Sequence, residues 1–184
     1  MVNYSLFIDN KEMLERFSKY SKITGVIFLI LGLVGIFWPG LMSLATAIFV
    51  GWLLLFSGFV IAFHTWQTNK KDWLGWLKTV IFIVTGGLIV INPFPGIAAL
   101  GIIFAIYFLM DAFASTALAF QMKPQPMWWL SLLNGILSLA IAIFFMIGWP
   151  FSSLWMVGLL VGISLFFDGI LLLSLGSAAK KNLQ

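Results

Sequence analysis

Long apolar stretches alternate with short polar breaks along nearly the whole chain. Stretches with no charge or almost none cover residues 23–38, 41–63, 77–91, 97–120, 127–149 and 152–175. A helix needs roughly 20 residues to cross a ~30 Å hydrocarbon core, and only helices or closed barrels satisfy their backbone there. Runs of this length are helical rather than barrel strands, so the pattern predicts six membrane-spanning helices. The first and third stretches are short, and they become plausible spans when each forms a hairpin with the longer stretch after it.

Three prolines divide the chain into three copies of one unit. Pro39, Pro93 and Pro150 each separate two apolar stretches, and they follow one another at nearly equal intervals. A regular interval of this kind indicates a repeat architecture. A polar residue follows each proline after 18 positions, and these residues are Ser57, Asp111 and Asp168. The repeat predicts an all-α membrane protein in which six transmembrane helices form three tandem helical hairpins.

The repeat also sets the predicted domain organisation. An N-terminal cytoplasmic or interfacial segment, residues 1–21, precedes one six-helix transmembrane domain, residues 22–176, and a cytoplasmic tail follows over residues 177–184. The three repeats within the domain cover residues 22–65, 76–120 and 127–176. Asp9 and Glu12 have the spacing of a capping signal, so an interfacial amphipathic helix is one interpretation of the first segment. A flexible, partly ordered tail is the other.

The positive charges predict an orientation. All ten lysines and arginines lie near the chain ends or near the segments that connect one repeat to the next: Lys11, Arg16, Lys19, Lys22, Lys70, Lys71, Lys78, Lys123, Lys180 and Lys181. The three proline turns carry none. The positive-inside rule therefore predicts that both termini are cytoplasmic and that the proline turns lie outside.

Composition narrows the class of protein further. With 62% hydrophobic residues, 9% charged residues and a mean hydropathy of +1.10, the chain has more apolar surface than a soluble domain of 184 residues can bury. The lipid bilayer is the expected partner, and nucleic acid is not, because the net charge of +4 is confined to the ends and loops. One histidine, no cysteine, no phosphate loop and no cluster with metal-ligand spacing predict neither an enzyme nor a metal or cofactor site.

Small residues recur seven positions apart on both helices of each predicted hairpin. On the first helices they include Gly25, Gly32, Gly86, Gly135 and Ala142, and on the second helices they are Gly51, Gly58, Ala105, Ala112, Gly162 and Gly169. Small residues allow helix backbones to approach closely in lipid, and a seven-residue period keeps them on one left-handed seam. We interpret them as helix-packing residues.

Polar residues also repeat on the first helices. They are Thr24, Lys78 and Asn134, and each precedes the proline of its own repeat by nearly the same number of positions. Because each residue advances a helix by a fixed rise, they reach a depth similar to that of the polar residues on the second helices. We therefore predict one polar pair within each hairpin: Thr24 with Ser57, Lys78 with Asp111, and Asn134 with Asp168.

The two aspartates admit two interpretations. Ionisable residues in a membrane are costly, which makes Asp111 and Asp168 candidates for proton or ion handling. However, 18 residues of helix span about 27 Å, so both lie one or two turns from the cytoplasmic boundary, where snorkelling and water reduce the cost. The interpretation we favour is that they are paired and orient the helices.

These features resemble the HdeD-like family of small bacterial inner-membrane proteins, which are built from three tandem two-helix repeats. The resemblance covers roughly residues 16–177. It rests on the Gly-x6-Gly-x6-Pro pattern ending at Pro39, a looser copy ending at Pro93, and the Asp-Ala and Asp-Gly dipeptides at 111 and 168. It implies a bacterial inner-membrane location and a part in acid-stress resistance, with no catalytic residues to transfer. Ser57, where the later copies have aspartate, departs from a strictly threefold mechanism.

Three functions are therefore weighed. The first is a non-enzymatic membrane protein that supports acid or envelope stress tolerance, alone or as a homo-oligomer. The second is a small ion, proton or solute transporter or channel that uses Asp111 and Asp168, since transporters are often built from repeats. The third is a subunit that docks another membrane protein through its glycine seams.

Overall fold

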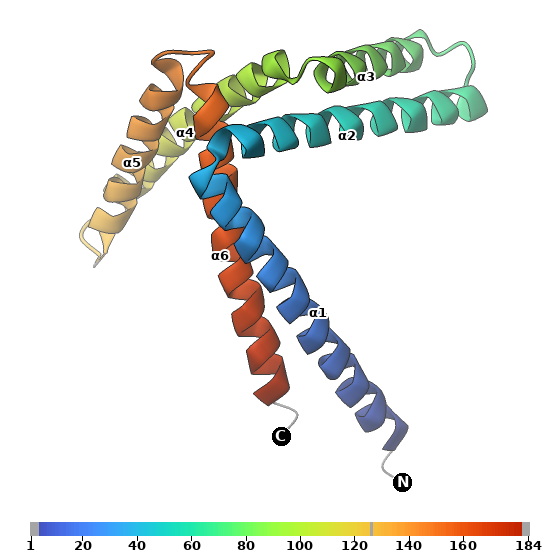
Figure 1. The fold of residues 1–184 in the computed structure, drawn as a ribbon. Helices are drawn as coiled ribbons and strands as arrows, with labels where there is room; N and C mark the ends of the chain where they lie inside the picture. Colours follow the sequence, from blue (N-terminus) through green and yellow to red (C-terminus); the bar gives the residue numbers. More distant parts are fainter. Residues whose placement is uncertain (1–3, 126, 182–184) are drawn as a thin grey trace. The chain divides into compact units, whose positions relative to one another are not determined.

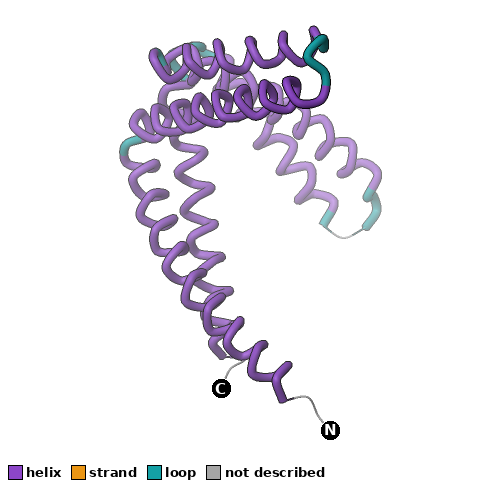
Figure 2. Tube along the Cα trace, turned by 90° about the vertical axis from the view of Figure 1, so that its right-hand side faces the viewer, coloured by secondary structure: helices purple, strands orange, loops and turns teal. Residues whose placement is uncertain are grey.

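The computed structural model describes residues 4–125 and 127–181, with side chains described for residues 13–125 and 127–179. Within these residues the chain forms α-helices joined by short connections (Figures 1 and 2). They are α1 (Tyr4–Phe37), α2 (Pro39–Thr68), α3 (Trp73–Ile91), α4 (Pro93–Gln121), α5 (Trp128–Met146) and α6 (Ser153–Lys181). All 6 contain a segment long and apolar enough to cross a membrane, which confirms the predicted all-α fold with six transmembrane helices.

Proline begins two of the helices. Pro39 is the first residue of α2 and Pro93 is the first residue of α4. Proline fits the first helical position because an amide hydrogen there would have no intrahelical partner. Pro150 lies in the turn before α6, which begins at Ser153. At the start of the chain, α1 is continuous, so residues 4–21 are helical and lead directly into the first span.

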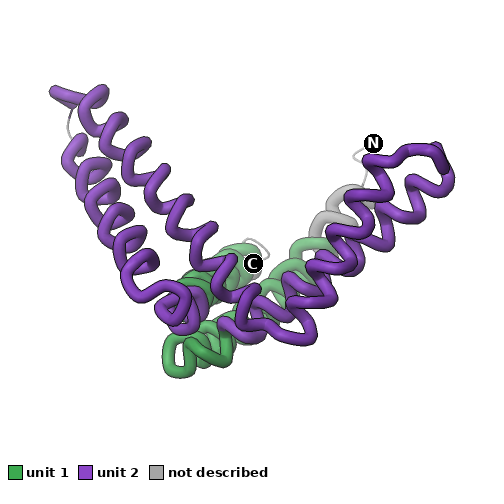
Figure 3. Tube along the Cα trace, turned by 90° about the horizontal axis from the view of Figure 1, so that it is seen from above, with its two compact units in different colours: residues 1–42, 159–184 green, residues 43–158 purple. Residues whose placement is uncertain are grey.

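The chain divides into two compact units (Figure 3). The first comprises residues 1–42 and 159–184, and the second comprises residues 43–158. In the first unit α1 lies beside α6 (Figure 1). A Cβ atom added to Gly35 would lie 2.6 Å from the Cα of Gly162, and one added to Gly25 would lie 3.0 Å from the carbonyl oxygen of Gly169. The two helix backbones are therefore in direct contact.

The second unit contains two further helix pairs. α2 lies beside α3, and a Cβ added to Gly86 would lie 2.8 Å from the carbonyl oxygen of Gly51. α4 lies beside α5, and a Cβ added to Gly135 would lie 3.0 Å from the carbonyl oxygen of Ala112. In each pair, small residues from both helices therefore meet where the backbones approach closely.

In the second unit, the helices in close contact are those joined by the polar loops and not those joined by the proline turn. α2 and α3 are joined by residues 69–72 and α4 and α5 by residues 122–127, whereas only Asn92 separates α3 from α4. Helices joined by so short a turn meet close to that turn. α3 therefore meets α4 beside their shared turn, where Gly96 faces Ile89.

A layer of buried residues follows the prolines on α2, α4 and α6 within the second unit. Ala47, Gly101 and Gly158 occupy the same position in the three repeats, counted from the prolines, and all three are buried. The backbone N–H of Gly158 donates a hydrogen bond of 2.7 Å to the Ser43 hydroxyl, and the Ser153 side chain packs against Gly101. The predicted packing residues did not include this layer, although its spacing recurs in all three repeats.

Gly86 and Gly87 provide a matched test of the contact between α2 and α3. A methyl group added at Gly86 would meet backbone atoms of α2 at 2.8 Å, whereas one at Gly87 would meet nothing within 4 Å. Alanine favours a helix over glycine by about 1 kcal/mol, but overpacking costs about 1–3 kcal/mol. We expect Gly86→Ala to lower the free energy of unfolding in mixed micelles and Gly87→Ala to maintain or raise it. Equal effects would contradict the contact.

Candidate functional site

Four polar side chains meet between α4 and α5. The Ser138 hydroxyl donates a hydrogen bond of 2.5 Å to Oδ2 of Asp111, and the Asn134 amide donates one of 3.1 Å to the same oxygen. The Ser115 hydroxyl donates to Oδ1 of Asp111 over 3.4 Å. Ser115 and Ser138 are buried and Asp111 is half-buried. We call these four residues the Asp111 cluster.

Helix spacing and backbone contact assemble the cluster. Asp111 and Ser115 lie four residues apart on α4, and Asn134 and Ser138 lie four residues apart on α5, so each pair shares one helix face. Gly135 lies beside Asn134, and a Cβ there would lie 3.0 Å from the carbonyl oxygen of Ala112. Because the backbones approach this closely, short side chains can bridge the two helices.

The donors in the cluster suit an ionised carboxylate. An ionised aspartate only accepts hydrogen bonds, and all three neighbours of Asp111 donate to it. Asn134 also donates to the Ser115 hydroxyl over 2.9 Å, which makes the network continuous. Hydrogen bonds to a charged group are about twice as strong as neutral ones, and a low local dielectric strengthens them further. The arrangement can hold α4 against α5 and makes that hold depend on the charge of Asp111.

The predicted pair of Lys78 with Asp111 is wrong. Asp111 takes its partners from α4 and α5 rather than from Lys78 of α3, and Asn134, which was assigned to Asp168, donates to Asp111. Lys78 is exposed, and the described residues contain no ion pair between it and Asp111. The reason is the helix pairing: each polar residue of a first helix was assigned to the helix across its proline turn, whereas α5 packs against α4 across residues 122–127.

The other repeats do not reproduce the cluster. The Ser57 hydroxyl donates to the carbonyl oxygen of Leu53 in its own helix over 2.7 Å. Asp168 is exposed, and its carboxylate has no hydrogen bond or ion pair with any side chain that the structure describes. Beside Gly25, α1 carries the half-buried Thr24 and, four residues later, Phe28, where α5 carries Asn134 and Ser138. The aromatic residue offers no hydroxyl to a carboxylate.

Sequence reasoning missed the two serines of the cluster. Ser115 lies four residues after Asp111, and Ser138 lies four residues after Asn134. Polar residues at this spacing in an apolar helix indicate one polar face. Applied to both helices, that rule identifies all four members. The described part of the chain has no group of three or more His, Asp or Glu that could hold a metal ion.

Replacing Asp111 tests the energetic contribution of the cluster. Asp111→Asn removes the charge and turns one acceptor oxygen into a donor that faces other donors. We expect the free energy of unfolding in mixed micelles to fall by about 1–2 kcal/mol. Asp168→Asn is the matched control, and because Asp168 is exposed we expect a change within about 0.5 kcal/mol. Equal losses at both positions would show that the cluster has no contribution of its own.

Comparison with known proteins gives the chain its relatives. The family model described as a short repeat of unknown function (DUF308) matches residues 23–81, 77–147 and 144–184. Protein HdeD of Escherichia coli (strain K12) is 26% identical over 170 residues, which cover 90% of this chain and 90% of that protein. The HdeD proteins of Escherichia coli O157:H7 and Shigella flexneri match to the same extent. No solved structure matches the chain.

The family matches and the fold agree on the class of protein. The repeat model accounts for most of the chain in three stretches, and the helices of the structure are long and apolar enough for a multi-pass membrane protein. The chain therefore belongs to the HdeD-like family of membrane proteins built from the DUF308 repeat.

Proposed function

We propose that this protein is a non-catalytic, multi-pass protein of the bacterial cytoplasmic membrane that supports survival of acid or envelope stress. The similarity to HdeD proteins supports the stress role, and the repeat architecture supports the membrane role. The observation that carries the proposal is the convergence of three donors on the carboxylate of Asp111, between two membrane-spanning helices. In this proposal the Asp111 cluster is the element through which acid acts on the protein.

Protonation changes what the cluster can do. The ionised Asp111 accepts from Ser115, Asn134 and Ser138, and none of these three partners titrates. A protonated carboxyl is uncharged and carries one O–H donor of its own, so it matches three donors less well. In this proposal, protonation of Asp111 therefore weakens the contact between α4 and α5. Acid would shift the protein toward a state in which these helices are held less tightly.

Transport is the second candidate function considered. A path that uses both aspartates gains no specific support from the geometry, because their environments differ. Asp111 is half-buried and accepts from three donors, whereas Asp168 is exposed and has no side-chain partner in the described residues. The third candidate function is that of a partner subunit or homo-oligomer. In that case the contact between α4 and α5 at the Asp111 cluster would regulate assembly with the partner or with other copies.

A survival assay tests the proposed function. Wild type, Asp111→Asn and Asp168→Asn are expressed at equal levels in a bacterium that lacks its own HdeD-like protein, and viable cells are counted after acid challenge. We expect wild type and Asp168→Asn to improve survival, and Asp111→Asn to give the survival of the empty vector. Equal protection by all three forms would refute the assigned role of Asp111. No protection by wild type would refute the stress function.

The proposed topology has the termini inside and the proline turns outside, on the basis of the lysine and arginine distribution. The chain has no cysteine, so a single introduced cysteine can show on which side of the membrane its position lies. Gly40 has nothing within 4 Å of an added Cβ, and Lys71 is exposed between α2 and α3. We expect a membrane-impermeant maleimide to label Gly40→Cys in intact spheroplasts and Lys71→Cys only after permeabilisation. The opposite result would invert the topology.

A further inference from the structure

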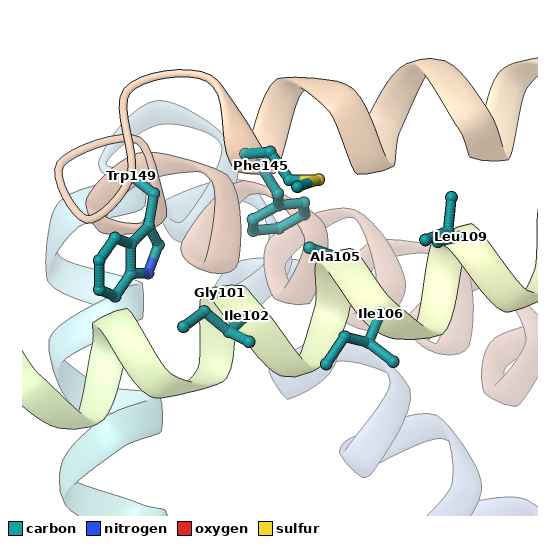
Figure 4. A pocket seen from close by; sticks show the side chains of 8 residues that line it. Gly101, Ile102, Ala105, Ile106, Leu109, Phe145 and Trp149 are labelled. Carbon is teal, nitrogen blue, oxygen red and sulfur yellow. The ribbon is translucent and has the colours of Figure 1, made fainter.

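A partly open cavity of about 370 Å³ lies between α4, α5 and the turn before α6, on the side of the Asp111 cluster that faces Pro150. Figure 4 shows Gly101 and Ala105 along α4, with Phe145 and Trp149 on the opposite side. Met146 also lines the cavity. All of these residues belong to the second unit, so the cavity lies within one compact part of the chain.

The repeat explains why a cavity forms at this helix pair. Gly51, Ala105 and Gly162 occupy equivalent positions in the three repeats, counted from the prolines. Gly51 lies against Gly86, and Gly162 lies against Gly35, so bare backbones meet in the other two pairs. The α4–α5 pair has Ala105 on one helix and Ala142 on the other. A methyl group at each position takes the place of the bare backbone found in the α2–α3 pair.

The side chains near this layer also differ. In the α2–α3 pair, Ile89 and Val90 cover Gly51, each with a methyl carbon 3.0 Å from an added Cβ. In the α4–α5 pair, Phe145 is almost fully buried and stacks on Phe108, with 6.5 Å between ring centroids. Met146, the next residue, is 66% exposed. The space beside Ala105 is therefore left open.

The walls of the cavity are apolar. The polar side-chain atom among the lining residues is Nε1 of Trp149, and it already donates a hydrogen bond of 3.1 Å to the carbonyl oxygen of Ala98. A water molecule needs two to four polar partners, so these walls do not hold water. Ile106 and Met146, at the rim, are 53% and 66% exposed and lie in candidate membrane spans. The cavity therefore opens toward hydrocarbon.

We propose that this cavity is a binding site for one acyl chain of a membrane lipid. A water molecule occupies ~30 Å³ of liquid, and a methylene group is similar in size. The cavity therefore holds roughly a dozen carbons. That is the size of an acyl chain and larger than one inserted side chain from a second copy. The acyl chain gains no hydrophobic free energy by leaving the bilayer, because bulk lipid is equally apolar. Dispersion contacts with the fixed walls of the cavity therefore retain it.

Photo-crosslinking tests the site. The full chain is reconstituted in vesicles that contain a phospholipid with a diazirine on one acyl chain, and labelled residues are identified by peptide mass spectrometry. We expect labelling to concentrate on Met146 and Ile106, the exposed residues at the rim of the cavity. Ala105→Leu fills the cavity and should reduce this labelling severalfold, whereas Ala114→Leu, on an exposed position of the same helix, should not.

One further variant keeps the test independent of folding. Met146→Ala shortens an exposed rim side chain, so it should preserve the fold and maintain or raise labelling of Ile106. Labelling is measured in vesicles without acid challenge, so its outcome is separate from that of the survival assay. Uniform labelling of exposed residues that Ala105→Leu does not change would overturn the site. Crosslinks from cavity residues to a second copy would overturn it as well.

Discussion

Helices in a bilayer gain little from burying apolar side chains against each other, because hydrocarbon surrounds them on every other side. Close backbone contact at small residues is the interaction that remains, and this fold depends on it. Gly35 meets Gly162, Gly51 meets Gly86, and Gly135 meets the backbone beside Ala112. These contacts decide which helices are neighbours and at what distance. The polar residues that can meet, and the space left between helices, both follow from that choice.

The Asp111 cluster illustrates this dependence. An aspartate in an apolar helix is costly unless partners lie within reach, and the short side chains of Asn134 and Ser138 reach it because Gly135 brings the backbones together. The α1–α6 pair has the same close approach at Gly25 but places an aromatic residue where α5 has Ser138. Equivalent backbone geometry therefore gives different chemistry, because the side chains around each glycine differ.

Part of this structure could be predicted from the sequence. The repeat and the length of the apolar stretches predicted the six helices, since both are properties of each segment taken alone. The choice of partner could not be predicted in the same way, because a seam of small residues shows that a helix packs and does not identify its neighbour. The serines were missed because α5 was assigned to the wrong neighbouring helix. Ser138 has no evident role until α5 is placed against α4.

The α4–α5 pair differs from the other two in a way that links its polar and apolar features. Its repeat positions hold Ala105 and Ala142 where the α2–α3 pair has Gly51 and Gly86, and a cavity lies beside Ala105. The same pair has the hydrogen-bonded aspartate one to two turns further along α4. In this pair, the bonds that Asp111 accepts from Asn134 and Ser138 join the two helices. The threefold repeat therefore acts as a scaffold, and the pair that departs from its glycine pattern is the one that contains both the polar cluster and the cavity.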